Sequence, residues 1–361
     1  MENRARLSSL RVDEAAYLRL IRGQSVGVAA RAARVALSVG AAGYRLGVAL
    51  RNAGYDRGVL TSRRAAVPVI SVGNITLGGT GKTPTVEWVA RWFRRRGVRV
   101  AILSRGYGQA AGMNDEGRVL EENLPDVPHL QAPDRVALAH AAVEELEAEV
   151  LVLDDGFQHR RLARDLDIVL LDALDPFGPG RLFPRGLLRE PPRSLGRAGV
   201  VILSRADLVA EADRLGIRAA AERQAGPLRW VEARHAPLDL VDFTVRSSPL
   251  GELDGRRIAA FCGIGNPEGF RRTLESLGAA LASFRAFPDH HSYTAADVAE
   301  LTSWSAAAGA DLVLTTQKDS VKLRAETLGP TPLRALRVGL EFLQGDAIME
   351  TTLAPLLPPR M

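Results

Sequence analysis

The stretch TLGGTGKT, residues 76–83, combines three glycines with one of the rarest side chains of this protein. Of the 47 Lys and Arg residues only three are lysine, and one of them is Lys82 in this stretch. A compact ammonium on a flexible stem suits a place where a planar guanidinium does not fit. Glycines at 78, 79 and 81 let successive backbone N–H groups turn toward a single anionic point. The stretch therefore predicts a phosphate-binding loop.

The segments on either side of this loop have the required character. VPVISVGN (67–74) is a β-rich run, and PTVEWVARWFRRRG (84–97) has helical spacing and ends at glycine. A strand, a glycine-rich loop and a helix in this order are the setting of a nucleotide-binding phosphate loop, although the standard spacing has glycine where residue 76 is threonine. Lys82 would reach the β- and γ-phosphates of ATP, and the Thr83 hydroxyl would bind Mg²⁺. The expected ATP contacts are Thr76, Leu77, Gly78, Gly79, Thr80, Gly81, Lys82 and Thr83.

Acidic residues further along the chain complete the expected chemistry. LVLDDGFQH places Asp154 and Asp155 at the end of an apolar run, where a carboxylate that holds Mg²⁺ should lie. Side chains alternate along a strand, so only one of the two should face the nucleotide, and the sequence leaves open which one. A second acidic stretch, NDEG (114–117), and the segment FPDHHSYT (287–294) could pair a carboxylate with a histidine to deprotonate an acceptor hydroxyl. From spacing alone, solvated loop charges are the simpler interpretation.

Apolar strands alternate with helical patterns through the first two thirds of the chain, which is typical of a mostly parallel sheet with helices on both faces. We predict an α/β core of the P-loop NTPase type over residues 67–235. RWVEARHAPLDLVDF (229–243) is an extended connector to a smaller α/β domain over 245–335. Residues 336–361 would form a return strand and a C-terminal segment.

The composition limits the classes of function. Cys262 is the single cysteine, which excludes an intramolecular disulfide and a CxxC metal site. The first residues lack the apolar core of a secretory signal, and no run approaches the ~18 apolar residues of a membrane-spanning helix. Residues 1–66 hold twelve arginines and four acids, a balance of +8, so the rest of the chain carries −3 of the net charge of +5. We predict that residues 1–66 form a basic helical region attached to the core.

The basic charge falls on an amphipathic segment, residues 25–50. At 100° per residue, Arg31, Arg34, Ser38 and Arg45 lie within about 60° of arc and leave a broad apolar face. Two interpretations stay open: a helix that packs on its own domain, or a helix that lies in the interface of an anionic membrane. No aromatic or arginine-rich recognition pattern supports binding to nucleic acid.

Several motifs, taken together and in order, resemble those of the tetraacyldisaccharide 4′-kinases, the lipid A kinases of outer-membrane biogenesis. They extend over about residues 15–345 and are, besides the phosphate loop, SRGYG (104–108), NDE, DDGFQH (154–159), FPRGLLREP (183–191), FCGIGNPEGF (261–270), FPDHHSYT and TTQKDSVKL (315–323). The resemblance implies phosphorylation, with ATP and Mg²⁺, of the 4′-hydroxyl of a tetraacylated glucosamine disaccharide 1-phosphate. It also implies peripheral attachment to the cytoplasmic face of the inner membrane through residues 25–50, a two-stranded hinge between the domains, and no obligate protein partner.

The resemblance also assigns roles to individual residues. Asp115 matches the family's catalytic aspartate, Glu116 its neighbour, and His290 the histidine that pairs with that aspartate. Further functional positions of the family fall on Arg105, Arg135 and Glu190, and the metal-binding positions on Thr83, Asp154 and Asp155. The family usually has GDEP where this chain has NDEG, and the gap from SRGYG is shorter here. His290 is preferred to His291 because it directly follows the PD of its motif.

Two other classes of nucleotide-binding protein share part of the pattern. GGTGKT fits a P-loop switch ATPase of the partitioning or metal-delivery type, but Leu77 occupies the place of the signature lysine of that class. ILSRADL (202–208) is similar to the base-reading element of a GTPase, with Ser204 and Arg205 in place of the usual residues. A kinase for a lipid-free small molecule is the third alternative, if the N-terminal helix packs internally.

Overall fold

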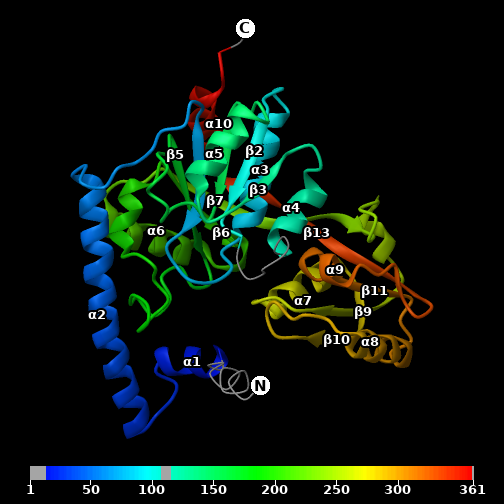
Figure 1. Ribbon diagram of the computed structural model, residues 1–361. Coiled ribbons are helices and arrows are strands. Elements are labelled where there is room, and N and C mark those ends of the chain that lie inside the picture. The colour runs from blue at the N-terminus through cyan, green and yellow to red at the C-terminus, as the bar shows by residue number, and fades with distance from the viewer. Residues whose placement is uncertain (1–13, 107–114, 360–361) are drawn as a thin grey trace, which may run out of the picture.

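A single sheet runs through the whole protein, and its larger part is parallel. The computed structural model describes residues 14–106 and 115–359 (Figure 1). Within them the strand order is β10-β9-β11-β13-β7-β6-β5-β1-β4-β2-β3, and every neighbouring pair from β7 to β3 is parallel. This parallel part consists of β1 (Val69–Asn74), β2 (Val100–Ser104), β3 (His129–Gln131), β4 (Val150–Asp154), β5 (Leu166–Asp172), β6 (Val200–Ser204) and the start of β7 (Trp230–Val241).

Helices cover both faces of this parallel part, as the continuous apolar strands predict. On one face, α3 (Lys82–Arg94) and α10 (Asp346–Leu353) pack on side chains of β1, β4 and β5. On the other, α5 (Arg135–Glu144) and α6 (Glu211–Ala225) cover the alternate side chains of the same strands. All six residues of β1 are buried, so the loop that follows β1 stands on a rigid base.

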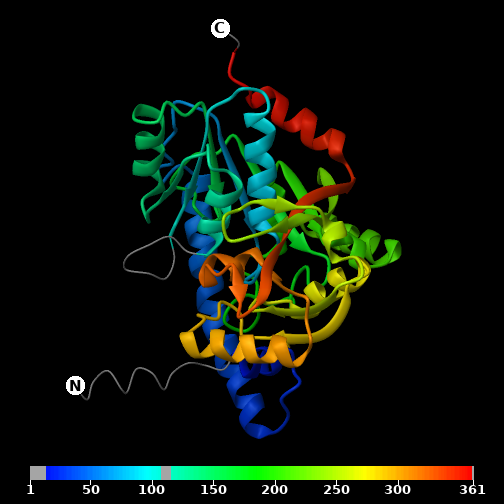
Figure 2. The same cartoon turned by 90° about the vertical axis from the view of Figure 1, so that its right-hand side faces the viewer.

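Two long strands connect this core to a smaller α/β lobe. β7 and β13 (Thr331–Gln344) are antiparallel, and β7 pairs with β6 at one end while β13 pairs with β11 at the other. The small lobe contains β9 (Arg257–Cys262), β10 (Ala280–Ala286), β11 (Leu312–Thr316), α7 (Pro267–Ser276), α8 (Ala295–Ala307) and α9 (Gln317–Leu323). Seen from the side, it lies below the core and against α4 (Asp115–Asn123) (Figure 2). Because the sheet continues from the core into the small lobe through β7 and β13, it does not mark where one domain ends and the next begins. The predicted domain boundaries stay a prediction.

The N-terminal helices pack along one side of the core. α1 (Glu14–Ile21) is followed by α2 (Val28–Asp56), which runs along one side of the molecule (Figure 1). Val48 is the buried residue of α2, and most of its other side chains are at least partly exposed. None of the helices within residues 14–106 and 115–359 is long and apolar enough to span a bilayer. Residues 1–13 of the predicted N-terminal region lie outside the described residues.

Three elements differ from the sequence-based expectation. NDEG reads as an acidic loop, but α4 begins at Asp115; Asn114 and residues 107 and 108 of SRGYG lie outside the described residues. The apolar run in ADLVLTTQKDSVKL (310–323) predicts one strand, but only Leu312–Thr316 is extended. The residues that follow form α9, because the Thr316 side chain accepts a hydrogen bond from the Asp319 backbone N–H and caps a helix there. Residues 280–286 form the edge strand β10, which no sequence pattern signalled.

Candidate active site

The predicted phosphate loop, between β1 and α3, turns at glycines with left-handed backbone conformation. Gly78 and Gly81 have positive φ angles of 112° and 86°, which glycine adopts without the strain of a Cβ atom. The Asn74 side chain donates to Thr80 Oγ1 at 3.0 Å, and Ser204 Oγ donates to the Thr80 carbonyl at 2.8 Å. The ends of β1 and β6 therefore fix the loop from below. The first turn of α3, with Lys82 and Thr83, begins where the loop closes.

Gly81 leaves room for a side chain of the connecting strand β7. A Cβ atom at this position would lie 2.3 Å from Nε2 of His235, which is far inside van der Waals contact. Nε2 of His235 is buried, and burial lowers the pKa of His235 to about 3, so the ring is neutral. The phosphate loop thus rests directly on the strand that connects the core to the small lobe.

Asp155 faces the phosphate loop. Its carboxylate lies 3.6 Å from Nζ of Lys82 and accepts hydrogen bonds from Arg189 at 2.8 and 2.9 Å. Its φ of 55° turns the chain sharply after β4, so Asp155 leaves the alternation of the strand. Burial would raise the pKa of Asp155, but Lys82 and Arg189 hold it below the ordinary value. The sequence analysis missed Arg189, although it is next to Glu190 in a recognised motif.

Asp154, the last residue of β4, has the properties of a cation ligand. Its Oδ1 is buried without a hydrogen-bond partner, and burial raises its pKa to about 6, opposed mainly by the charge of Lys82. A buried carboxylate oxygen without a donor is costly unless a cation satisfies it. Within the described residues no three His, Cys, Asp or Glu side chains form a metal cluster. The single unpaired carboxylate oxygen of Asp154 suits Mg²⁺, which binds through one or two carboxylates and completes its shell with phosphates and water.

The small lobe brings a histidine to the start of α4. Nδ1 of His290 lies 3.4 Å from Oδ2 of Asp115, although the two residues are 175 positions apart. The neighbouring His291 instead faces Asp297 at 3.3 Å. The loop that carries His290 can approach because Gly263 has no side chain: a Cβ atom there would lie 3.2 Å from the Pro288 carbonyl. Asp115 raises the pKa of His290 through this hydrogen bond.

Two lysines of α9 complete the contact between the lobes. Nζ of Lys318 lies 2.7 Å from Glu116, and Nζ of Lys322 lies 3.7 Å from Asp115. Burial alone would raise the pKa values of both carboxyls, but their partners hold them below the ordinary range. The charge of Glu116 in turn raises the pKa of Asp154, so the carboxylates of α4 and β4 act on one another. The sequence analysis did not place these lysines, and their rarity was the available signal.

Arg105 and Arg135 lie at the same edge of the sheet. Arg135 is buried and begins α5, whose N-terminus is capped by the Asp134 side chain. Its charge opposes the rise that burial causes in the pKa of Asp154, and it helps to hold the pKa of Asp155 below the ordinary value. Arg105 follows β2 directly and is exposed. Both predicted positions therefore lie at the carboxyl ends of parallel strands, where ligands of open α/β sheets bind.

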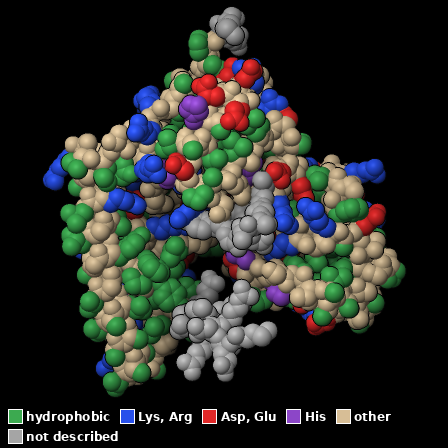
Figure 3. Space-filling view, in the orientation of Figure 1, with side chains coloured by type: hydrophobic (Ala, Val, Ile, Leu, Met, Phe, Trp, Pro, Cys, Tyr) green, Lys and Arg blue, Asp and Glu red, His purple; other side chains and the backbone are tan. Residues whose placement is uncertain are grey.

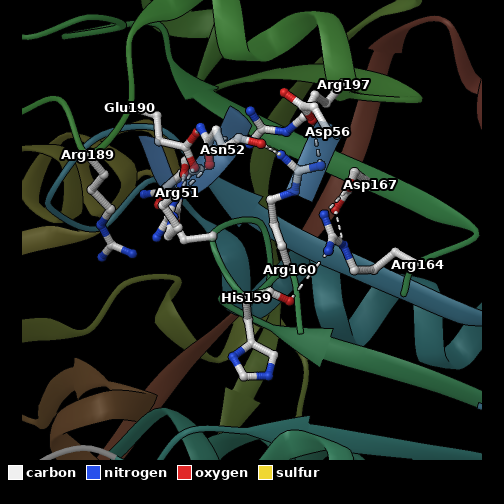
Figure 4. A network of polar contacts seen from close by, with 12 residues as sticks. Arg51, Asn52, Asp56, His159, Arg160, Arg164, Asp167, Arg189, Glu190 and Arg197 are labelled. Carbon is white, nitrogen blue, oxygen red and sulfur yellow. Dashed lines mark hydrogen bonds and ion pairs between the residues drawn. The ribbon is translucent and has the colours of Figure 1, made fainter. Parts of the chain in front are cut away.

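Glu190 does not contact the other predicted site residues that this subsection describes. Its side chain is fully buried and accepts hydrogen bonds from Asn52 at 2.8 Å and Arg197 at 3.0 Å, and Arg51 lies at 3.4 Å (Figure 4). The adjacent Arg189 points away from these partners (Figure 4) and instead donates to Asp155. The structure thus uses Glu190 to fasten α2 to the core, and the predicted catalytic role stays a prediction.

The comparisons with known proteins agree on one family. Residues 33–357 match the family model described as tetraacyldisaccharide-1-P 4′-kinase. The chain belongs to the tetraacyldisaccharide 4′-kinase family. It is 48% identical over 332 residues to the tetraacyldisaccharide 4′-kinase of Anaeromyxobacter dehalogenans, covering 86% of this chain and 87% of the relative. With that of Geobacter sulfurreducens it shares 40% over 340 residues, covering 88% and 92%.

A solved structure of the family has the same fold. LpxK from Aquifex aeolicus, in complex with ATP, superposes with a TM-score of 0.72 at 29% identity, covering 90% of this chain and 99% of that chain. The P-loop NTPase-type fold predicted from the sequence is confirmed, and the chain is a lipid A kinase by family rather than a partitioning or metal-delivery switch ATPase.

Proposed function

We propose that this protein transfers the γ-phosphate of ATP to the 4′-hydroxyl of a tetraacylated glucosamine disaccharide 1-phosphate, giving ADP and the 4′-phosphorylated lipid A precursor. Membership of the family supports the reaction and the substrate. One observation in the structure carries the assignment of the site. The Asp115–His290 pair is assembled from both lobes, and the charge of the neighbouring Glu116 acts on Asp154 in the core, which also feels the charge of Lys82 in the loop.

The nucleotide would bind along the phosphate loop. Backbone N–H groups of residues 78–83 and the N-terminus of α3 favour the phosphates, and Lys82 offers its ammonium to the β- and γ-phosphate oxygens. The Thr83 hydroxyl and Asp154 would hold Mg²⁺, which would neutralise phosphate charge when bound. Asp155 holds Lys82, and Arg189 holds Asp155, so the ammonium is oriented before ATP binds.

Asp115 would act on the acceptor. Its carboxylate is ionised at neutral pH and takes the proton of the 4′-hydroxyl as the oxygen forms its bond to the γ-phosphorus. The bond between the γ-phosphorus and the bridging oxygen breaks, and ADP leaves. His290 holds the carboxylate through Nδ1 and favours its ionised form. Arg105 and Arg135 add positive charge at the phosphate end of the site.

A radiolabel assay tests this proposal. Purified protein is incubated with γ-³²P-ATP, Mg²⁺ and the tetraacyldisaccharide 1-phosphate in mixed micelles, and label is followed in the lipid and in free phosphate. We expect label at the 4′ position and little hydrolysis to free phosphate. Hydrolysis without labelled lipid would contradict the proposed acceptor, and no turnover of either kind would contradict the proposed nucleotide site.

We also propose that α2 binds the cytoplasmic face of the inner membrane. At 100° per residue, its large exposed apolar side chains fall within about 60° of arc, roughly opposite the core-facing Tyr44, Val48 and Arg51. They are Val28, Val35, Val39, Leu46 and Leu50, each at least 60% exposed. Hydrophobic side chains follow the whole of α2 in Figure 3. An apolar stripe that faces away from its own protein supports an interfacial helix.

Vesicle sedimentation tests the membrane proposal. Vesicles with anionic lipid should bind the wild type, and Val35→Ser with Val39→Ser should weaken binding at every salt concentration because apolar burial is lost. Changing Arg31, Arg34 and Arg45 to glutamine should weaken binding chiefly at low salt. Binding that neither change affects would contradict the assignment of α2 as the membrane-binding helix.

A further inference from the structure

The three lysines of this chain all lie in or beside the candidate active site. Lys82 faces Asp155, Lys318 faces Glu116, and Lys322 faces Asp115. All other basic side chains, 44 of the 47 Lys and Arg residues, are arginine. The phosphate loop accounts for Lys82. The proposed function assigns nothing to Lys318 and Lys322, which lie on the other lobe.

Lys322 is held in place by a buried carboxylate. Its Nζ lies 3.0 Å from Oδ1 of Asp319, which is fully buried. Oδ2 of Asp319 accepts hydrogen bonds from the Gly263 backbone N–H at 2.9 Å and from Thr316 Oγ1 at 2.7 Å. The Lys322 side chain is 10% exposed, so its ammonium has little freedom to leave. The same ammonium lies 3.7 Å from Asp115 and thus bridges two carboxylates.

A buried amide pair fixes how α9 lies on α4. Asn123, the last residue of α4, donates to Gln317 at 3.1 Å and accepts from it at 2.9 Å. Asn123 also donates to Glu87 of α3 at 2.8 Å, and all three side chains are buried. A buried polar network that is fully paired allows few alternative arrangements. It therefore sets the register that places Lys318 on Glu116 and Lys322 on Asp115.

We propose that Lys322 and Lys318 are positioning residues of the phosphoryl transfer, by which the small lobe orients the carboxylates of Asp115 and Glu116 and keeps them ionised. This rests on the proposed role of Asp115 as the base. A compact ammonium can bridge Asp319 and Asp115 as a point charge, whereas a guanidinium fork favours one carboxylate in a plane. The base is then complete only while α9 lies on α4.

The charges around Asp115 come from three elements. His290 faces it from the loop before α8, Lys322 and Lys318 from α9, and Glu116 from its own helix. Beyond these, Asp289 lies near His290, and Asp319 neutralises part of the charge of Lys322. Because the ammonium groups favour the carboxylate, removing one should make Asp115 protonate at higher pH.

The test is the pH dependence of kcat/KM for lipid phosphorylation. Lys322→Met keeps the length of the side chain and removes the charge. We expect the acid limb to move to higher pH, with a loss of roughly tenfold on that limb and recovery toward the wild-type rate at higher pH. Lys322→Arg keeps the charge but not the bridge between Asp319 and Asp115, so its limb should lie between those of the wild type and Lys322→Met. Arg118→Met removes a charge from the same interface, where Arg118 donates to the Val321 carbonyl, and should leave the limb in place.

An equal loss at every pH for Lys322→Met would overturn the proposal, since packing damage does not follow pH. Lys322→Met could fail to fold because it leaves Asp319 without a partner. In that case the pH profile of kcat/KM is compared between the single variant Asp319→Asn and the double variant Asp319→Asn, Lys322→Met. Asp115→Asn separates this proposal from the proposed function. An active Asp115→Asn would contradict the base itself, while an inactive Asp115→Asn with an unmoved limb for Lys322→Met would overturn only the role of the lysine.

Discussion

At the scale of single residues, the site depends on small cations placed between carboxylates. Lys82 is fixed by Asp155, which is fixed by Arg189, and Oδ1 of Asp154 is buried without a hydrogen-bond partner. Each of these side chains comes from the carboxyl end of a strand or from the loop beyond it. The chemistry is therefore set by a few atoms whose positions the sheet dictates.

Replacing Lys82 tests this arrangement at the nucleotide. Lys82→Ala should lower kcat at least about 10²-fold, because charge at the β/γ bridge loses its counter-ion. Lys82→Arg should be nearly as damaging, since the planar fork does not fit the space of an ammonium. Rates come from the radiolabel assay, and circular dichroism checks the fold. Near-normal turnover of a folded Lys82→Ala protein would rule out the phosphate-loop interpretation.

At the scale of elements, local motifs predicted the core better than the contacts between lobes. The strand before Gly78 and the helix after Lys82 follow from hydrophobic spacing and glycine placement, which act over a few residues. The family resemblance, rather than spacing, selected Asp115 and His290, because a contact across 175 positions leaves no local pattern. α9 was missed although Thr316 and Asp319 form a helix-start signature, because the preceding apolar strand suggested that the extended chain continues.

The attachment of α2 gives a prediction at this scale. Glu190→Ala would leave Arg197 and Asn52 without their buried partner and should lower the free energy of unfolding by roughly 3 kcal/mol. Limited proteolysis should then cut the segment of α1 and α2 faster than in the wild type. Glu190→Gln keeps hydrogen-bonding capacity, so its free energy of unfolding and its rate of proteolysis should lie between those of the wild type and Glu190→Ala. A drop in kcat for Glu190→Gln with unchanged proteolysis would instead favour the catalytic role that the sequence predicted.

At the scale of the whole molecule, stability should depend on pH through a buried histidine. The pKa of His235 is about 3 in the folded protein and near 6.5 when unfolded, so the unfolded state binds more protons between these values. Stability should therefore fall as the pH drops below about 6.5, by about 1.4 kcal/mol per pH unit for this one group.

Urea denaturation at pH 7 and pH 5 measures this effect. His235→Gln cannot titrate and should show a smaller loss of unfolding free energy between the two pH values than the wild type. Some loss should remain, because burial also lowers the pKa of His129 to about 4. Equal losses in the two proteins would mean that His235 is protonated in the folded state.

The Asp115–His290 pair joins the two lobes. The core supplies the phosphate loop and Asp115, the small lobe supplies His290, and β7 and β13 connect them. We propose that Asp115 and His290 act as a single unit on the acceptor hydroxyl. If so, losing the histidine after the carboxylate is gone should cost nothing further.

The most direct measurement is kcat for lipid phosphorylation in Asp115→Ala, His290→Ala and the double variant, with ATP affinity measured in parallel. We predict that Asp115→Ala lowers kcat by about 10²- to 10⁴-fold with ATP binding largely kept, and that His290→Ala costs less. The double variant should be no slower than Asp115→Ala. Fully additive losses would show that the two residues work independently. An active Asp115→Ala enzyme would contradict the role of Asp115 as the base.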